Sequence, residues 1–198
     1  MGHSLIIDKI VIDSASATDL VALADLLGIL FTQEAEFQPS KDLQLKALRR
    51  IVESPEVGRI LCARAGNVSV PGSTGPGNPK TLSEPKNYSH STQASDSTQE
   101  ISANSPSNHS VVGMVSLLFT ESTALGAKVA LLEDMIVLPE YRACKVGSKL
   151  LSAAIACALE SGCKRITLLT DQANTQAQHF YKMHGFEQSS MSAFRLLL

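Results

Sequence analysis

The sequence predicts a single α/β domain with a mixed β-sheet and helices packed against it. Apolar strand-like runs and amphipathic helical patterns alternate along most of the 198 residues. Hydrophobic residues make up 44% of the chain, enough for a substantial core. One long polar stretch interrupts the alternation, and the remaining length suits one domain. We therefore expect one domain over residues 1–198.

The polar stretch covers residues 67–110 and consists mostly of Ser, Thr, Asn, Gly, Pro and Gln. Such a composition cannot bury enough apolar area to offset the entropy lost on ordering. We expect a flexible low-complexity insertion between two strands. The domain can tolerate it because loop-closure entropy grows slowly with loop length.

Four elements are expected before the insertion. The first helix has leucines on one face and Thr18 as an available N-cap. The second helix has its own apolar stripe, and Pro55 ends it. The order is strand, helix, helix, strand, at 5–13, 18–35, 40–54 and 59–66.

Six elements are expected after the insertion. Two strands joined by a turn precede a strongly patterned helix that Gly162 closes. A nearly continuous apolar strand follows, as expected when both faces of a sheet are covered. A helix ending at Gly185 and a last strand complete the chain. The six elements lie at 111–123, 128–137, 146–162, 165–171, 174–185 and 186–198.

The turn from Arg142 to Ser148 joins a strand end to a helix start. Free N–H groups and the helix dipole favour an anion there, and Arg142 and Lys145 add positive charge. An ordinary strand–helix connection with solvated basic residues would look the same. The turn alone therefore leaves both interpretations open.

A second segment, NTQAQHFYKMHGF at 174–186, could by itself be a core aromatic pair beside a glycine C-cap. Together the two segments are more specific. VLPEYRACKVGSKLL resembles the cofactor motif V-x-P-x-x-[RQ]-x-x-G-x-[GA]-x-x-L-L of the GNAT superfamily of acyl-CoA N-acyltransferases. The second segment resembles that family's N-x-x-A-x-x-F-Y-x-x-x-G-F motif. The resemblance runs from Val111 to the end of the chain.

The resemblance implies a mostly antiparallel sheet with helices on both faces and a gap between two splayed parallel strands. Acetyl-CoA would lie in this gap. Its pantetheine arm would pair with backbone at Ile136 and Val137, and Asn174 would steady it. Tyr181 would point at the thioester sulfur. The pyrophosphate would rest on the turn, at Arg142, Lys145, Val146, Gly147 and Ser148.

Lys145 departs from the family pattern, which has glycine at this position. If the site needs a positive φ, the lysine side chain could crowd the pyrophosphate. If the backbone is that of a plain helix start, Lys145 could instead add a charge near the phosphates.

Two acidic residues, Glu133 and Asp134, precede the cofactor motif on the same expected strand. Strand alternation puts them on opposite faces unless a bulge intervenes. The stretch LLEDMIVLPEYR resembles diamine and polyamine acetyltransferases, which implies that the pair contacts the amine end and aids its deprotonation. A solvated pair of carboxylates is the alternative. Glu34, after the first helix, would lie at the acceptor pocket or would be surface charge.

The resemblance implies an N-acetyltransferase that joins acetyl-CoA and a primary amine in a ternary complex. Glu133 would take the amine proton directly or through water. Backbone N–H near Ile136 would stabilise the oxyanion, and Tyr181 would protonate the leaving thiolate. The alternative is a catalytically silent acyl-CoA-binding or sensor module. The amine itself, whether small molecule or peptide, is left open.

Net charge, apolar patterning and cysteine content narrow the classes of possible partner. The net charge is −2 and the pI is near 6.2, so no basic footprint for nucleic acid exists. No apolar run is long enough to span a membrane, and the first residues do not resemble a signal peptide. The four cysteines form no CxxC pair or His/Cys cluster, which favours a reduced, cytoplasmic chain without metal. Family members are often dimers, so a homodimer is open.

Overall fold

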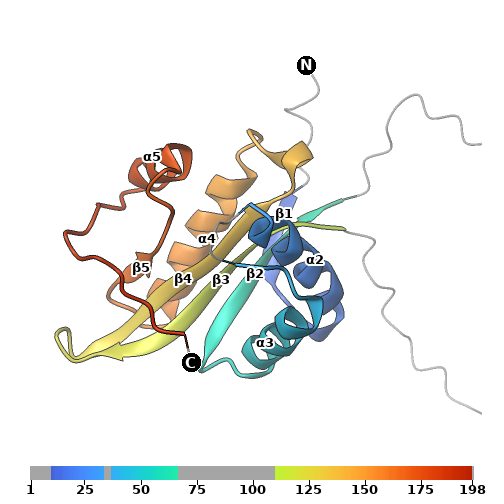
Figure 1. Ribbon diagram of the computed structural model, residues 1–198. Helices are drawn as coiled ribbons and strands as arrows, with labels where there is room; N and C mark the ends of the chain where they lie inside the picture. Colours follow the sequence, from blue (N-terminus) through green and yellow to red (C-terminus); the bar gives the residue numbers. More distant parts are fainter. Residues whose placement is uncertain (1–9, 34–36, 67–109, 198) are drawn as a thin grey trace, which may run out of the picture.

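The computed structural model describes residues 10–33, 37–66 and 110–197. Its strands form one sheet with the spatial order β1-β2-β3-β4-β5. Neighbouring strands are antiparallel except β4 and β5, which are parallel. The predicted mixed, mostly antiparallel sheet is confirmed (Figure 1). The strands are β1 (Ile10–Ser14), β2 (Gly58–Ala65), β3 (Ser110–Ser122), β4 (Ala127–Val137) and β5 (Ile166–Leu168).

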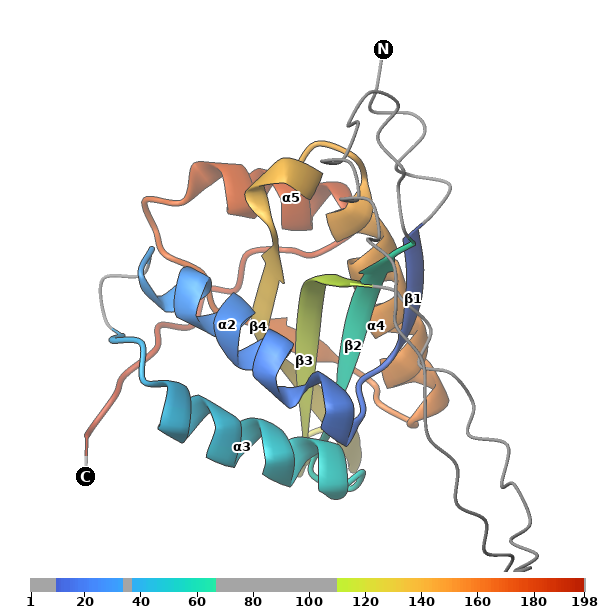
Figure 2. The same cartoon turned by 90° about the vertical axis from the view of Figure 1, so that its right-hand side faces the viewer.

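Helices cover both faces of the sheet, as predicted. α2 and α3 lie on one face and α4 lies on the other (Figure 2). α5 packs on the α4 side through Phe180 and Tyr181. No helix in the described part of the chain is long and apolar enough to cross a membrane. The helices are η1 (Ala17–Asp19), α2 (Leu20–Phe31), α3 (Lys41–Glu53), η2 (Pro139–Tyr141), α4 (Val146–Glu160) and α5 (Thr175–Met183).

Strand β2 shows why the inner strands are apolar on both faces. Ile60 and Cys62 belong to the core under α2 and α3. Leu61 and Ala63 alternate with them and belong to the core under α4. Because successive side chains point to opposite faces, a strand between two helix layers must be apolar at nearly every position.

The predicted last strand, 186–198, is wrong. No helix or strand forms between Phe186 and Leu197. Gln188, Ser189 and Ser190 interrupt its apolar pattern, and β5 offers only three residues for pairing. The side chains of Phe194 and Leu196 are 96% and 83% exposed. We call residues 186–197 the tail.

The start of the first helix also differs from the prediction. The 3₁₀ turn η1, with Ser16 as its N-cap residue, precedes α2, and Asp19 is the N-cap residue of α2 in place of Thr18. The Ser16 N–H and Oγ both donate to Asp19 Oδ2, at 2.7 and 2.8 Å. Thr18 lies inside the 3₁₀ turn η1. Arg64 of β2 then holds this turn, donating to both carboxylate oxygens of Asp19 at 2.7 and 3.0 Å and to Asp13 of β1.

Candidate active site

Strands β4 and β5 pair over only a short length. Their parallel register runs from Ala130 opposite Ile166 to Leu132 opposite Leu168. β4 then continues to Val137 along β3, whereas β5 has ended. The β5-facing edge of β4 is therefore without a strand partner beyond Leu132 among the described residues, as the predicted gap between splayed parallel strands requires.

A β-bulge lies where this edge begins. Val115 of β3 pairs with Met135, but Leu117 pairs with Leu132, so β4 uses one residue more than β3 between these pairs. Glu133 and Asp134 are together opposite Ser116. A bulge breaks the alternation of side chains along a strand. Both carboxylates line one cavity, as the sequence argument allows when a bulge intervenes.

Ser116 binds Asp134 through two hydrogen bonds. Its Oγ donates to Asp134 Oδ2 at 3.0 Å and accepts from the Asp134 N–H at 3.1 Å. Burial raises the pKa of Asp134 to about 6, the Ser116 hydroxyl opposes the rise, and the neighbouring Glu133 carboxylate adds to it. Glu133 itself is exposed. Asp134 therefore titrates just below neutral pH, within the range useful for proton transfer.

Backbone groups of β4 also face the open edge. The Leu138 N–H donates to the Val112 C=O, which lies directly opposite it on β3. Backbone groups of a strand alternate in direction, so Leu138 and Ile136 both turn their N–H and C=O toward β3. By the same alternation, Met135 and Val137 turn theirs toward the open edge. The backbone groups expected at Ile136 are thus offered by Met135 instead. Arg142 Nε already donates to Val137 O at 3.0 Å.

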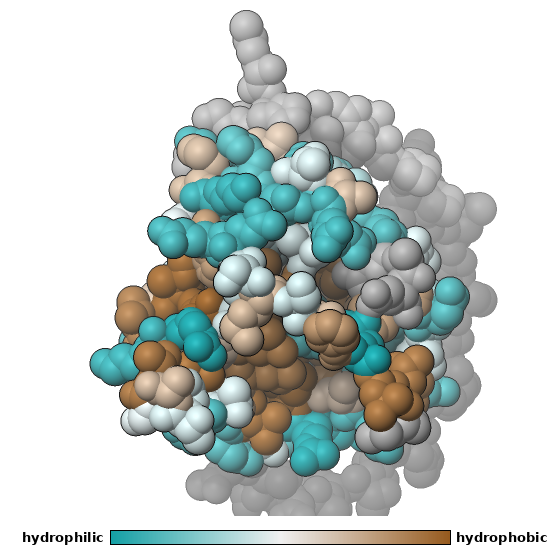
Figure 3. Space-filling view, turned by 60° about the vertical axis from the view of Figure 1, so that its left-hand side comes forward, coloured by the Kyte–Doolittle hydropathy of each residue, from teal (hydrophilic) through white to brown (hydrophobic). Residues whose placement is uncertain are grey.

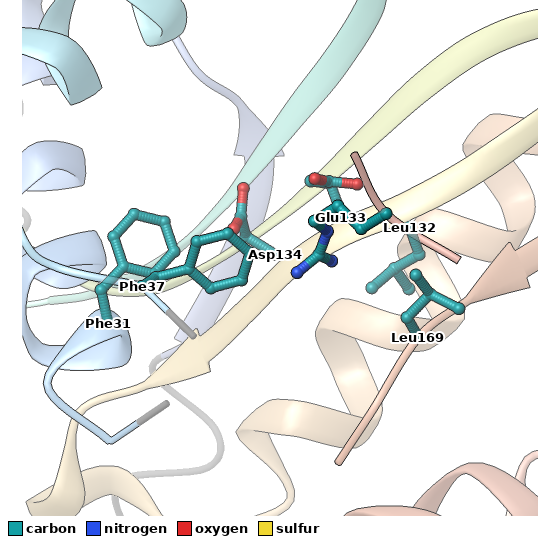
Figure 4. A pocket seen from close by; sticks show the side chains of 7 residues that line it. Phe31, Phe37, Leu132, Glu133, Asp134 and Leu169 are labelled. Carbon is teal, nitrogen blue, oxygen red and sulfur yellow. The ribbon is translucent and has the colours of Figure 1, made fainter. Parts of the chain in front are cut away.

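The cavity beside the carboxylates has a volume of about 110 Å³ (Figure 4). Two aromatic rings form part of its wall, with the Phe31 and Phe37 centroids 5.6 Å apart. The guanidinium carbon of Arg195, from the tail, lies 5.1 Å from the Phe37 centroid. The cavity is lined by Phe31, Phe37, Leu132, Glu133, Asp134, Leu169 and Arg195. Glu34, predicted at this pocket, lies outside the described residues.

The turn before α4 has an unusual backbone. Ala143 and Lys145 have φ values of 59° and 60°, in the left-handed region that glycine adopts most easily. Cys144 and Val146, which alternate with them, are buried and anchor the turn. Helix α4 begins at Val146, so the N–H groups of Val146, Gly147 and Ser148 have no acceptor within the helix. Such N–H groups at a helix start form an anion site.

The conformation of Lys145 answers one question left by the sequence. Its φ is positive, so the position has the geometry that the motif glycine would adopt. Lys145 is exposed, and its carbonyl oxygen accepts from Lys149 N–H at 3.0 Å. The first alternative, a site that needs a positive φ, is therefore the observed backbone.

Helix α5 brings the second motif beside the first. Asn174 caps this helix, with its Oδ1 accepting from Ala177 N–H at 3.0 Å, which leaves the amide NH₂ as its donor end. A Cβ added at Gly147 would lie 3.6 Å from Phe180 and 3.7 Å from Met135. The α4 start, α5 and the open edge of β4 therefore meet at one place. Gly147 is the position where a side chain would enter it.

Tyr181 is half-buried on α5, with its ring packed edge-on against Phe180 and Phe186 at 5.3 and 5.8 Å. Burial raises the pKa of its phenol, so the hydroxyl is protonated at neutral pH. A protonated phenol can donate a hydrogen bond or a proton.

Several site residues were missed at the sequence level. Ser116 is separated from Asp134 by the whole β3–β4 turn, and only the strand register brings them together. Phe31 and Phe37 lie six residues apart and Arg195 lies near the other end of the chain, and none of the three belongs to either motif. The readable signals were the two motifs and the acidic pair before the first of them.

Comparisons with known proteins agree with this geometry. The Acetyltransferase (GNAT) family matches residues 78–186. The chain is 32% identical over 83 residues to the uncharacterized N-acetyltransferase YhfO of Bacillus subtilis, which covers 42% of this chain and 56% of that protein. It is 36% identical over 80 residues to thialysine N-epsilon-acetyltransferase of Bos taurus, covering 40% and 46%. The chain thus spans about half the length of the curated relatives it matches.

A solved structure shows the same fold. It is aminoglycoside N-acetyltransferase AAC(6')-Iy in complex with CoA, which aligns with a TM-score of 0.62 at 17% identity. The alignment covers 95% of this chain and 94% of that one. At this identity the likeness concerns the fold alone.

Proposed function

The chain belongs to the acetyltransferase (GNAT) family, and we propose that it transfers an acetyl group from acetyl-CoA to a primary amine in a ternary complex. One observation carries the proposal. The open edge of β4 has a bulged carboxylate pair at one end and, at the other, the turn in which Ala143 and Lys145 are left-handed. A cofactor with a phosphate end and a thioester end would span these features. Acetyl-CoA, the acyl donor of this family, has both ends.

The turn supports binding of the pyrophosphate. The N–H groups of Val146, Gly147 and Ser148 would donate to it, with positive charge supplied by Arg142 and Lys145. The outward Met135 C=O and Val137 N–H would pair with the amide groups of the pantetheine arm. The amide NH₂ of Asn174 would donate to the same arm.

The two carboxylates support removal of a proton from the amine. An ammonium group has no lone pair to attack with, so a base must accept its proton. Asp134, with a pKa of about 6, is ionised at neutral pH and is matched to that task. We assign it the proton, and we assign the exposed Glu133 to attract the ammonium and to relay the proton through water. The Met135 N–H would stabilise the oxyanion.

The test of the proposal follows release of free thiol from acetyl-CoA in the presence of a panel of primary amines. Amine-dependent release that falls sharply in both Asp134→Asn and Glu133→Gln supports the assignment. CoA binding without release for any amine would contradict it and would favour a catalytically silent acyl-CoA-binding module. A loss confined to Glu133→Gln would transfer the base role to Glu133.

Tyr181 is proposed to protonate the departing CoA sulfur. Tyr181→Phe keeps the ring and its packing and removes only the acid, so kcat should fall about 100-fold, as typical for general acids. The dissociation constant of CoA, measured by calorimetry, should change far less. Tyr141→Phe, which removes a phenol from η2, is the matched control and should retain activity. An unchanged kcat in Tyr181→Phe would remove Tyr181 from the mechanism.

A further inference from the structure

We propose that the Phe37 ring is a subsite for a second, non-reacting cationic group of the acceptor, and that Arg195 of the tail occupies this subsite until the acceptor displaces it. The inference rests on the proposed function and specifies the acceptor class as amines with a second positive charge, such as diamines. It begins from one contact. The Arg195 guanidinium carbon lies 5.1 Å from the Phe37 centroid, within the range of cation–π attraction.

The packing of the two aromatic residues leaves the Phe37 ring accessible to a ligand. Phe31, at the end of α2, packs against Phe37 with an interplanar angle of 42° and so fixes the orientation of its ring. Phe37 is nevertheless 41% exposed. An exposed phenylalanine ring binds most strongly a ligand that has a flat or apolar stem and a positive charge at its end. The Arg195 side chain is such a ligand.

The charges of the cavity favour cations at the same place. Two of its seven lining side chains are carboxylates, those of Glu133 and Asp134, and one is the Arg195 cation. An acceptor that brings an ammonium group in place of Arg195 preserves this balance. An acceptor with an acidic end would add a third negative group next to the pair, which is unfavourable in a partly desolvated site.

The size of the cavity indicates that Arg195 leaves when the acceptor binds. The cavity of about 110 Å³ is well below the roughly 300 Å³ at which ligand pockets usually begin. Withdrawal of the arginine side chain would enlarge it at the end where Phe37 lies. Arg195 therefore occupies space that the acceptor would take, and it is not a fixed part of the cavity wall.

The tail is suited to such a displacement. It has no helix or strand, and the side chains of Phe194 and Met191 are 96% and 86% exposed. Apolar surface lies open to solvent on the face of the molecule that Figure 3 shows. A segment with few buried contacts opens at low free-energy cost. Release of the tail therefore costs little beyond the contacts of the Arg195 side chain itself.

The first experiment compares acceptors of equal length that differ at one end. For each chain length from 1,3-diaminopropane to 1,6-diaminohexane, the diamine is set against the alkylamine and the ω-amino acid of the same length. The full chain saturated with CoA is titrated by calorimetry, and KM is measured in parallel. The diamine should bind about two- to fivefold more tightly than the alkylamine at the best length, the factor expected for an exposed cation–π contact, and the amino acid should bind most weakly.

Three variants locate the effect. Arg195→Ala should lower KM for the diamine several-fold, because the internal competitor is gone. Phe37→Leu should abolish the preference for the diamine over the alkylamine. Phe194→Ala, next to Arg195 and almost fully exposed, is the matched control and should change neither value.

Contrary outcomes separate the two proposals. Tighter binding of the amino acid than the diamine, weakened in Arg195→Ala, would mean that Arg195 is a fixed anion-binding wall and would overturn the inference. Equal binding of diamine and alkylamine would also overturn it. If calorimetry shows the diamine preference and its loss in Phe37→Leu but no amine is acetylated, the subsite stands and the proposed enzymatic function fails.

Discussion

At the scale of single residues, the protonation of Asp134 depends on one hydroxyl group. Ser116 is fully buried on β3, and its Oγ donates to the carboxylate that burial pushes toward the neutral form. A hydrogen bond donated to a carboxylate favours the charged form. Ser116 therefore keeps the pKa of Asp134 near 6 rather than higher.

Ser116→Ala should move the acidic limb of the pH–rate profile upward. The burial of Asp134 persists while its hydrogen bond is lost, so its pKa should rise by about one unit, the equivalent of a lost charge-assisted hydrogen bond. Since the base must be ionised, activity at pH values below the new pKa should fall, and activity at high pH should be retained. The profile of kcat/KM measures this. Ser122→Ala, on the same strand far from the cavity, should leave the profile in place; an unshifted profile in Ser116→Ala would show that Asp134 is not the titrating base.

Lys145 is a residue whose conformation and charge can be tested separately. Relief of its left-handed backbone in Lys145→Gly should stabilise the fold by about 0.5–1 kcal/mol, measured by urea unfolding. The N–H groups of the turn are already in place with lysine, so glycine removes mainly the charge. We therefore expect CoA to bind a few-fold more weakly, most clearly at low salt.

Lys145→Gln is the control for this experiment, because it keeps a long side chain and removes the charge. Weakened CoA binding in both variants assigns the effect to the charge. Tighter CoA binding in Lys145→Gly alone would mean that the lysine side chain crowds the pyrophosphate.

At the scale of secondary-structure elements, η1 is attached to the sheet by a cluster of charges. Arg64 of β2 binds Asp19 of η1 and Asp13 of β1, and the Arg64 hydrogen bonds, opposed in part by burial, lower the pKa of Asp19 to about 2. A carboxyl whose folded-state pKa lies below its unfolded value of 3.8 stabilises the fold at pH values above that value. This contribution is lost as the pH falls through 3.8 toward 2.

Asp19→Asn should therefore cost about 2 kcal/mol of unfolding free energy near neutral pH, the range for hydrogen bonds to charged groups. The difference between the wild type and the variant should shrink toward zero as the pH approaches 2. Urea unfolding at several pH values gives this difference directly. Asp25→Asn, which breaks an exposed pair with Lys41, should cost little at any pH. A pH-independent cost in Asp19→Asn would show a steric rather than an electrostatic origin.

Elements with a strong apolar pattern were predictable from the sequence, and the last expected strand was not. The expected strands at 111–123 and 128–137 and the helix at 146–162 agree with β3, β4 and α4 within two residues at each end. Their apolar patterns are long, and packing between the sheet and its two helix layers buries them. The strand expected at 186–198 failed because its apolar residues have nothing to pack against along the short β5. The bulge in β4 could not be predicted, since it depends on the register with Ser116.

At the scale of the whole molecule, the candidate site is an assembly of distant parts. β4 and the α4 turn carried recognisable motifs, but the cavity also needs α2, the segment at Phe37 and the tail. The motifs cover the part of the site that would bind the cofactor, which is the same throughout the family. The residues that would contact the acceptor are spread along the chain, so only the folded structure brings them together.

The segment between β2 and β3, residues 67–109, leaves and rejoins the sheet at neighbouring positions. Ala65 pairs with Ser110 at the end of the ladder. Replacement of residues 66–109 by Asn-Gly, a two-residue hairpin turn, should therefore preserve folding, with a Tm within a few degrees of wild type and unchanged CoA affinity. A Gly/Ser linker of native length is the control for loop length. Loss of folding in both variants would show that the segment contributes to the core.

The same pairing means that the backbone could be cut there and the protein still assemble. The polypeptide before the cut would contribute β1, β2, α2 and α3, and the polypeptide after it would contribute the rest of the sheet with both motifs. The β2–β3 register and the shared apolar layers would then form a protein–protein interface between two separately expressed fragments. Neither fragment holds the whole cavity, so reconstituted acetyl transfer would report directly on the meeting of whatever partners are fused to them.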